Sequence, residues 1–255
     1  MTTNTCINLM RYDCLSLFPA KTRYLIDHTN VGKNKLFSQL SETAQRKLRC
    51  NNMHLVGNMK FTEENGFPVL RPFNLASFDY ELYAYSDRAR HTSTPWAVHF
   101  FIDDYRYIKA ITDNLEKTTQ ALYQCSVVFA PDCSLYVDAP FFVNKLNIYR
   151  SRFAAAYWQD CGYNVIQTAS WADANSLKYA FEGLAQQSAT AICGIGHDFC
   201  KAAKRLWNSA VDKLVEVTSP TLLFIYGGQA EDARRDFGVP VIYIEDFINK
   251  RFRRK

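Results

Sequence analysis

The chain has 255 residues, of which 48% are hydrophobic and 15% aromatic, so it is long enough to bury a core and too apolar to be disordered. Its 30 Lys and Arg against 25 Asp and Glu give a net charge of +5, and five of those cations lie in residues 250–255. The rest of the chain is therefore neutral. This distribution excludes a histone-like protein that binds nucleic acid over its whole surface, and it excludes an acidic solvating chain.

The cysteines and the N-terminus indicate a compartment. Eight cysteines occur without any Cys-x-x-Cys pair, and the first residues lack the charge and the apolar run of a signal peptide. We therefore expect reduced thiols and a cytoplasmic protein. No apolar run approaches the roughly 18 to 20 residues that span a bilayer, so we expect no membrane partner.

Residues 1–97 form an irregular N-terminal region. Residues 33–48, within the stretch 28–49, predict a polar surface helix, and short apolar pieces follow around 54–57 and 67–72. Residues 80–91 are aromatic and then charged. We expect this region either to complete the fold that follows or to stand as an extension.

Residues 98–249 form the predicted core, in which short apolar runs alternate with stretches of helical period. The expected strands are 98–102, 127–130, 164–168, 190–193, 221–225 and 241–244, and the expected helices are 106–124, 140–160, 175–184, 200–217 and 230–236. Apolar strands flanked by helices are typical of a covered parallel sheet.

Two arrangements of this sheet are consistent with the sequence. The first is a TIM-like (β/α) barrel, complete or incomplete, with the irregular N-terminal extension. The alternative is an open doubly wound sheet. We favour the barrel, because about 250 residues suit one barrel and no glycine-rich dinucleotide fingerprint occurs. Gly194 and Gly196 alone make a tight turn rather than a nucleotide cofactor motif.

The residues that follow the strands are the candidate site, because all βα loops of a parallel sheet emerge on the same side. Asp103, Asp104 and Asp132 follow the first two strands. Clustered carboxylates bind divalent cations or exchange protons, so they are assigned as catalytic and as ligands of Mg²⁺ or Mn²⁺. The alternative is that these aspartates are helix caps.

Other strand-end residues complete the predicted site. His197 is assigned as an acid or base, against the alternative of a hydrogen-bonded structural histidine. Tyr136, Trp171 and Tyr226 are assigned to the substrate. No His-x-x-x-His, Gly-x-Ser-x-Gly or P-loop pattern occurs, so zinc protease, esterase and Walker NTPase functions are unsupported.

Basic residues are the candidates for phosphate. Arg150 and Arg152 lie among aromatic residues of the helix 140–160 and are assigned to substrate phosphate, unless they form ion pairs on a buried helix. The tail residues Lys250, Arg251, Arg253, Arg254 and Lys255 are assigned to nucleic acid, unless they serve only solubility.

Several short motifs between residues 65 and 228 resemble the domain of unknown function 4417 family of bacteria, phages and other mobile elements. They are 65–68 (Asn-Gly-Phe-Pro), 99–105 (His-Phe-Phe-Ile-Asp-Asp-Tyr), 131–136 (Pro-Asp-Cys-Ser-Leu-Tyr), 149–152 (Tyr-Arg-Ser-Arg), 157–159 (Tyr-Trp-Gln), 165–171 (Val-Ile-Gln-Thr-Ala-Ser-Trp) and 226–227 (Tyr-Gly). The resemblance implies an α/β fold and a phage or mobile-element origin, and it implies no particular activity.

Two functional hypotheses follow. The first is a metal-assisted hydrolase that acts on a phosphorylated or nucleic-acid substrate. The second is a non-catalytic factor that binds nucleic acid or a host protein through the tail and aromatic surface. The sequence leaves the oligomeric state open.

Overall fold

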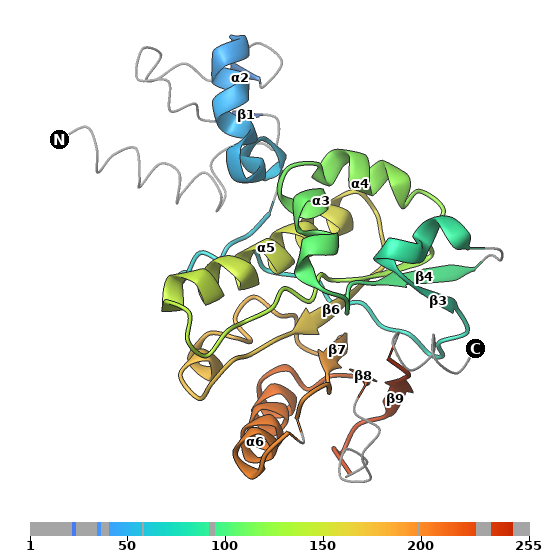
Figure 1. Ribbon diagram of the computed structural model, residues 1–255. Coiled ribbons are helices and arrows are strands. Elements are labelled where there is room, and N and C mark those ends of the chain that lie inside the picture. Colours follow the sequence, from blue (N-terminus) through green and yellow to red (C-terminus); the bar gives the residue numbers. More distant parts are fainter. Residues whose placement is uncertain are drawn as a thin grey trace.

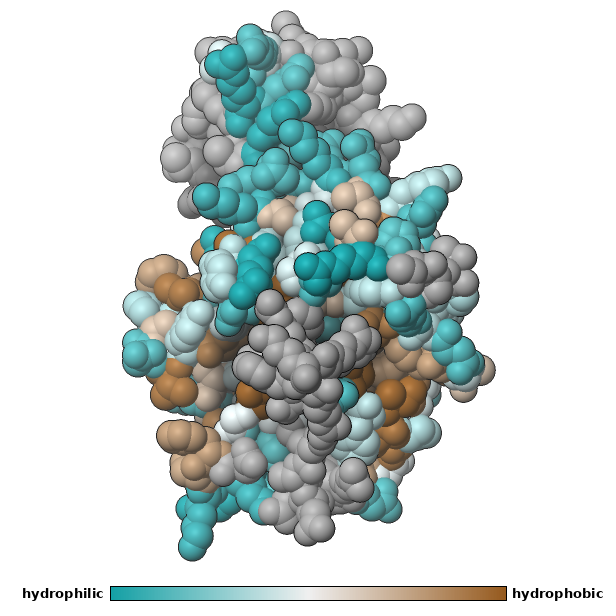
Figure 2. Space-filling view, turned by 45° about the vertical axis from the view of Figure 1, so that its right-hand side comes forward, coloured by the Kyte–Doolittle hydropathy of each residue, from teal (hydrophilic) through white to brown (hydrophobic). Residues whose placement is uncertain are grey.

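The computed structural model describes residues 22–23, 35–36, 41–57, 59–91, 95–197, 199–227 and 236–246. At the N-terminal end, β1 (Thr22–Arg23) pairs antiparallel with β2 (Lys35–Leu36), and α2 (Glu42–Arg49) leads into the 3-10 segment η3 (Cys50–Leu55). Glu42 and Arg46 pair across one exposed turn of α2, and Figure 2 shows a hydrophilic surface over this helix. Of the polar surface helix predicted over 33–48, the part from residue 42 onward forms, as α2; the prediction is wrong for residues 35–36, which pair with β1 as strand β2.

A sheet of seven parallel strands organises the rest of the chain. The strands are β3 (Glu81–Ala84), β4 (Trp96–His99), β5 (Val127–Phe129), β6 (Val165–Ala169), β7 (Ala189–Cys193), β8 (Leu222–Tyr226) and β9 (Val241–Ile244). Each strand pairs only with its neighbours in the sequence, so the spatial order equals the chain order. The sheet curls into an open half-barrel (Figure 1).

This order decides between the two arrangements. A doubly wound sheet reverses its strand order at a switch point, and this sheet runs from β3 to β9 without a reversal. The prediction of an incomplete TIM-like barrel is confirmed, and the doubly wound alternative is wrong.

The helices pack on one face of the sheet. They are α3 (Ile108–Thr112), α4 (Leu115–Ala121), α5 (Phe141–Asp160) and α6 (Lys201–Thr218), with 3-10 segments η4 (Tyr85–Arg90), η5 (Asp104–Arg106) and η6 (Ser176–Lys178). Alternation along β8 shows the two faces: Leu223 and Ile225 pack with Trp207 of α6, whereas Phe224 packs in a separate cluster.

The opposite, inner face of the sheet is covered by residues 73–82. Buried side chains of this face are Ala97, Phe101, Val127, Phe129, Ile166, Ala189, Ala191, Leu222, Phe224 and Tyr226. The Phe78 ring makes edge contacts with Phe129 at 5.9 Å and Phe224 at 5.0 Å. The Ala189 amide donates to the Phe73 carbonyl at 2.8 Å. The N-terminal region therefore fills the barrel interior and also supplies β3.

The predicted elements shift in places. All six predicted strands exist within three residues of their expected bounds, and residue 97 lies inside β4. The helix predicted over 106–124 is divided into η5, α3 and α4. Residues 230–235 of the last predicted helix lie outside the described part of the chain.

The helix predicted over 175–184 is wrong, since only the three-residue η6 forms there. The Ser176 amide donates to Asp173 Oδ1 at 2.7 Å, and the Ser176 hydroxyl accepts from the Ala172 and Asp173 amides. Such local side-chain bonds compete with helix formation. In addition, Gly183 has a φ of +80°, which ends the turn.

In the part of the chain that the structure describes, no helix has the length and apolar character needed to cross a membrane.

Candidate functional site

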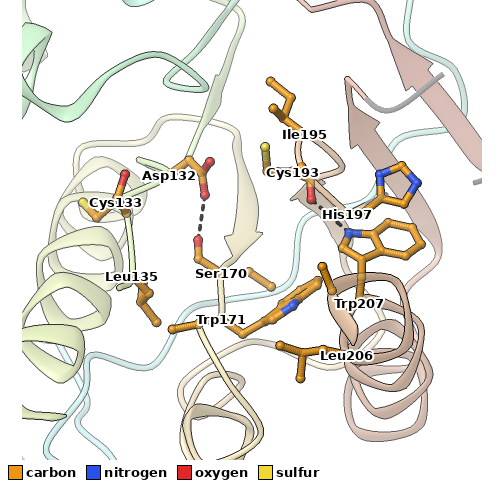
Figure 3. Close-up of a pocket in the computed structure, with 15 residues that line it drawn as sticks. Asp132, Cys133, Leu135, Ser170, Trp171, Cys193, Ile195, His197, Leu206 and Trp207 are labelled. Atoms are coloured by element: carbon orange, nitrogen blue, oxygen red, sulfur yellow. Dashed lines mark hydrogen bonds between the residues drawn. The ribbon is translucent and has the colours of Figure 1, made fainter. Parts of the chain in front are cut away.

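A pocket of about 340 Å³ opens at the carboxyl ends of β5, β6 and β7, beside the first turns of α6 (Figure 3). Its lining residues are Asp132, Cys133, Ser134, Leu135, Ala169, Ser170, Trp171, Ala172, Cys193, Ile195, Gly196, His197, Ala203, Leu206 and Trp207. The polar groups of this pocket come from the loops that follow consecutive parallel strands. The pocket therefore lies where the candidate site was expected, at the carboxyl ends of the strands.

Asp132 and Ser170 form the polar centre of the pocket. They follow β5 and β6, and the Ser170 hydroxyl donates a hydrogen bond to Asp132 Oδ1 at 2.6 Å. Burial raises the pKa of Asp132 to about 6; the Ser170 hydrogen bond opposes this shift, and the Asp104 charge adds to it. The Asp132 carboxyl therefore changes its protonation close to neutral pH.

Buried polar side chains of α5 hold the loop that carries Asp132. Each of them bonds to loop backbone: Asn144 to the Tyr136 amide at 2.9 Å and carbonyl at 2.8 Å, Asn147 to the Ser134 carbonyl at 2.7 Å, and Ser151 to the Pro131 carbonyl at 2.6 Å. Asn and Ser on a buried helix face thus fix both sides of Asp132. The carboxyl is presented on a rigid loop.

The other two predicted metal ligands, Asp104 and Asp103, are not among the residues that line the pocket. Asp104 accepts from the Ser134 amide and hydroxyl, each at 3.0 Å, and the Tyr107 hydroxyl lies 2.9 Å from Asp104 Oδ1. Asp103 is exposed and lies 3.3 Å from Arg106 in an ion pair. The structure thus places only Asp132 of the three aspartates on the pocket wall.

A metal site at these carboxylates stays a prediction. The described residues contain no group of three or more His, Cys, Asp or Glu that is arranged to hold a metal ion.

His197 lies on the side of the pocket away from Asp132 (Figure 3). Its side chain is buried, and its Nδ1 forms a short hydrogen bond with the Gly194 carbonyl. A carbonyl can only accept, so Nδ1 carries a proton and donates in this hydrogen bond. Nε2 is buried and has no hydrogen-bond partner among the described residues.

The remaining wall of the pocket is apolar. Trp207 is fixed, because its indole N–H donates to the Cys193 carbonyl at 3.1 Å and its ring lies 5.0 Å from the His197 ring. Trp171 is half-buried and makes an edge contact with Phe181 at 6.1 Å. Leu206 completes this wall beside the two indoles (Figure 3).

Several predicted site residues lie outside this pocket. Tyr136 is exposed, and Arg150 lines a separate pocket of about 20 Å³. Arg152 is buried and donates to the Thr168 carbonyl at 2.7 Å and the Ala180 carbonyl at 3.0 Å; burial lowers its pKa to about 9. Tyr226 is buried on the inner face and stacks on Phe101 at 4.7 Å. Residues 250–255, with all five predicted nucleic-acid contacts, lie outside the described residues.

Sequence reasoning missed two kinds of pocket residue. Ser170 comes two residues after the predicted strand 164–168, so its place near a strand end was predictable, but its link to Asp132 depends on the pairing of β5 with β6. Leu206 and Trp207 approach from α6, and only a fold that places the start of this helix beside β7 brings them to the site. No local sequence signal separates them from ordinary core residues.

Comparison with known proteins places this chain among relatives. The family described as "Domain of unknown function (DUF4417)" matches residues 59–247. The "Gene 1 protein" of Mycobacterium phage L5 is 36% identical over 131 residues, which cover 51% of this chain and 57% of that protein. The "Gene 1 protein" of Mycobacterium phage D29 is 33% identical over 131 residues, covering 51% and 48%.

The chain thus matches about half the length of these phage relatives. The similarity to phage proteins agrees with the origin that the sequence resemblance implies. No solved structure matches the chain.

Proposed function

Because this chain belongs to the DUF4417 family, a family of unknown function, we propose a function from its pocket: a hydrolase that acts on a small molecule by acid–base catalysis. Asp132 would be the general base and His197 the second proton-transfer group. The observation that carries this proposal is the Asp132–Ser170 pair in a pocket at the strand ends.

The geometry supports a division of roles between the two walls. With a pKa of about 6, the Asp132 carboxyl is mostly ionised at pH 7 to 8 and remains basic enough to take a proton from water. The water oxygen then attacks the substrate. His197 would act with a proton on Nε2, an atom that has no partner in the described structure: it donates this proton to the leaving group as the bond to the substrate breaks, and the proton that Asp132 took from water returns to solvent after the products leave. Titratable groups on different walls are a common arrangement for acid–base catalysis.

The test is a hydrolysis screen of the full chain on p-nitrophenyl esters, p-nitrophenyl phosphate and nucleosides, with and without Mg²⁺ or Mn²⁺. For any substrate turned over, Asp132→Asn should lower kcat/KM by about 10² to 10⁴-fold, the usual contribution of a general base. The wild-type rate should rise with pH through about pH 6, as Asp132 loses its proton.

The matched control is Asp103→Asn, since Asp103 follows the neighbouring strand but is exposed and paired with Arg106. Its activity should stay within about twofold of wild type, as for surface substitutions away from the chemistry. Equal losses in the two variants in the absence of Mg²⁺ and Mn²⁺ would refute the assignment of Asp132 as the general base. A rate that depends on Mg²⁺ or Mn²⁺ and on Asp132 would support the metal-assisted form of the proposal.

The second candidate is a binding factor, and exposed aromatic side chains near the strand ends favour it. Phe199, Tyr105 and Phe141 are exposed by 90%, 72% and 67%. Covering such side chains with a partner removes apolar surface from water, so these three residues are candidates for a contact surface. Deleting residues 250–255 and titrating DNA or RNA at several salt concentrations tests this candidate: a nucleic-acid binder should lose affinity and salt dependence together.

A further inference from the structure

The pocket has two chemically different walls. Asp132 and Ser170, from the ends of β5 and β6, form the polar wall. Trp171, Leu206 and Trp207 form the apolar wall, and Figure 3 shows both indoles on the side that leads toward α6. A ligand that fits must therefore offer a hydrogen-bonding edge and an apolar face in one small body.

The apolar wall is suited to an aromatic ring. Trp207 is held in place by its bond to Cys193, between the rings of His197 and Phe237 at 5.0 and 6.1 Å. Trp171 is only half-buried and lines the pocket. Aromatic side chains bind planar ligands by stacking, because every such ligand has a π face.

The polar wall is suited to a ligand that donates hydrogen bonds. Asp132 Oδ1 accepts from Ser170, and Oδ2 has no hydrogen-bond partner among the residues that the structure describes. A carboxylate only accepts, so its free oxygen selects an N–H or amino group. Carboxylate side chains recognise the exocyclic amino group of cytosine in this way.

Size and charge narrow the ligand further. A volume of about 340 Å³ lies at the small end of the range for ligand pockets. The described residues that line the pocket include no Lys or Arg, so this wall offers no cation to a phosphate. These features favour an uncharged ring over a nucleotide phosphate.

We infer that this pocket binds a planar nitrogen heterocycle of the nucleobase type, with its face on Trp171 and its amino edge on Asp132. The inference rests on the proposed function, for which it names the substrate class. The indole supplies stacking, and the Asp132–Ser170 pair supplies the polar contact that orients the ring.

The test is isothermal calorimetry of the full chain with cytidine, adenosine, guanosine and uridine, and with inorganic phosphate and ribose as comparison ligands. We expect the amino-bearing nucleosides to bind and ribose and phosphate to give no heat. Trp171→Leu should weaken nucleoside binding at least about fivefold, the low end of one stacking contact. Asp132→Asn should weaken the binding of cytidine by at least tenfold.

Tyr123→Leu is the control, since Tyr123 is 83% exposed and does not line the pocket. Circular dichroism and thermal unfolding of each variant show that it is folded. Absence of nucleoside binding at millimolar concentration would overturn the inference, and so would unchanged affinity in a folded Trp171→Leu chain. Binding of inorganic phosphate alone would overturn it in favour of an anion site.

Failure of this inference is distinguishable from failure of the proposed function. Hydrolysis of simple esters that requires Asp132, without nucleoside binding, would refute the proposed ligand class and support the proposed hydrolase activity. Nucleoside binding that requires Trp171, with no turnover of any substrate, would support the proposed ligand class and refute the proposed hydrolase activity.

Discussion

Asp132→Asn should stabilise the folded chain at neutral pH and leave its stability unchanged in acid. The folded carboxyl has a pKa of about 6, whereas its ordinary value in an unfolded chain is 3.8. Between these two values the folded state binds more protons than the unfolded state, so the free energy of unfolding falls as the pH rises through this window. Above about pH 6 the loss is complete.

The size of the effect follows from the difference between the two pKa values. At roughly 1.4 kcal/mol per pH unit, the ionised carboxyl costs the folded state about 3 kcal/mol. The Asp132 side chain is partly open to the pocket, and water there screens the charge, so we expect a gain of about 1 to 3 kcal/mol for the neutral amide. The amide oxygen of Asn still accepts from Ser170.

Urea unfolding at pH 7.5 and pH 4.0 measures this directly. Asp132→Asn should be more stable than wild type at pH 7.5, and the two should agree within about 0.5 kcal/mol at pH 4.0, where little of the linked free energy remains. Asp103→Asn, which removes an exposed charge, should show no such gain. An equal destabilisation by Asp132→Asn at both pH values would refute a raised pKa.

Three further substitutions test the packing around the site and the sheet. Asn144→Ala removes both hydrogen bonds to the Tyr136 backbone and should lower the free energy of urea unfolding by about 2 to 3 kcal/mol. Gly183→Ala places a Cβ 2.6 Å from the Pro68 carbonyl oxygen at a φ of +80°, and should lower Tm more than Gly162→Ala, which has a φ of +88° but open space; equal shifts would contradict the clash. Phe78→Ala removes a ring from the inner face and should cost about 2 to 4 kcal/mol in chemical denaturation.

The strands and their carboxyl ends were predictable from the sequence, because a buried parallel strand carries a continuous apolar run. The run 221–225 is wholly apolar after Thr221 and becomes β8, a buried strand. Asp132 follows such a run at 127–130, and Trp171 follows the next predicted strand, so their place on the pocket wall follows from the parallel topology.

The short β3 was not predictable in the same way. Its residues are mostly only partly buried, at an edge of the sheet, and its short apolar run lies between Glu81 and the charged stretch 87–91. The roles of Asp103 and Asp104 were also hidden. The two aspartates are adjacent in sequence, yet one is exposed beside Arg106 and the other bonds to Ser134, thirty residues away. Their different environments depend on which residues the fold brings beside each carboxylate, Arg106 for Asp103 and Ser134 for Asp104.

The cover of the inner face has a consequence for synthesis on the ribosome. Phe73 bonds to Ala189 and Asn74 to Thr221, so partners lie 116 and 147 residues apart in the chain. Residues 73–82 leave the exit tunnel long before β7 and β8, and their aromatic side chains then lack most of their final neighbours. Contacts of such sequence separation form late. The apolar side chains of residues 73–82 therefore stay partly exposed on the nascent chain until β7 and β8 have been translated, and the synthesis of these two strands lets the inner face of the sheet close.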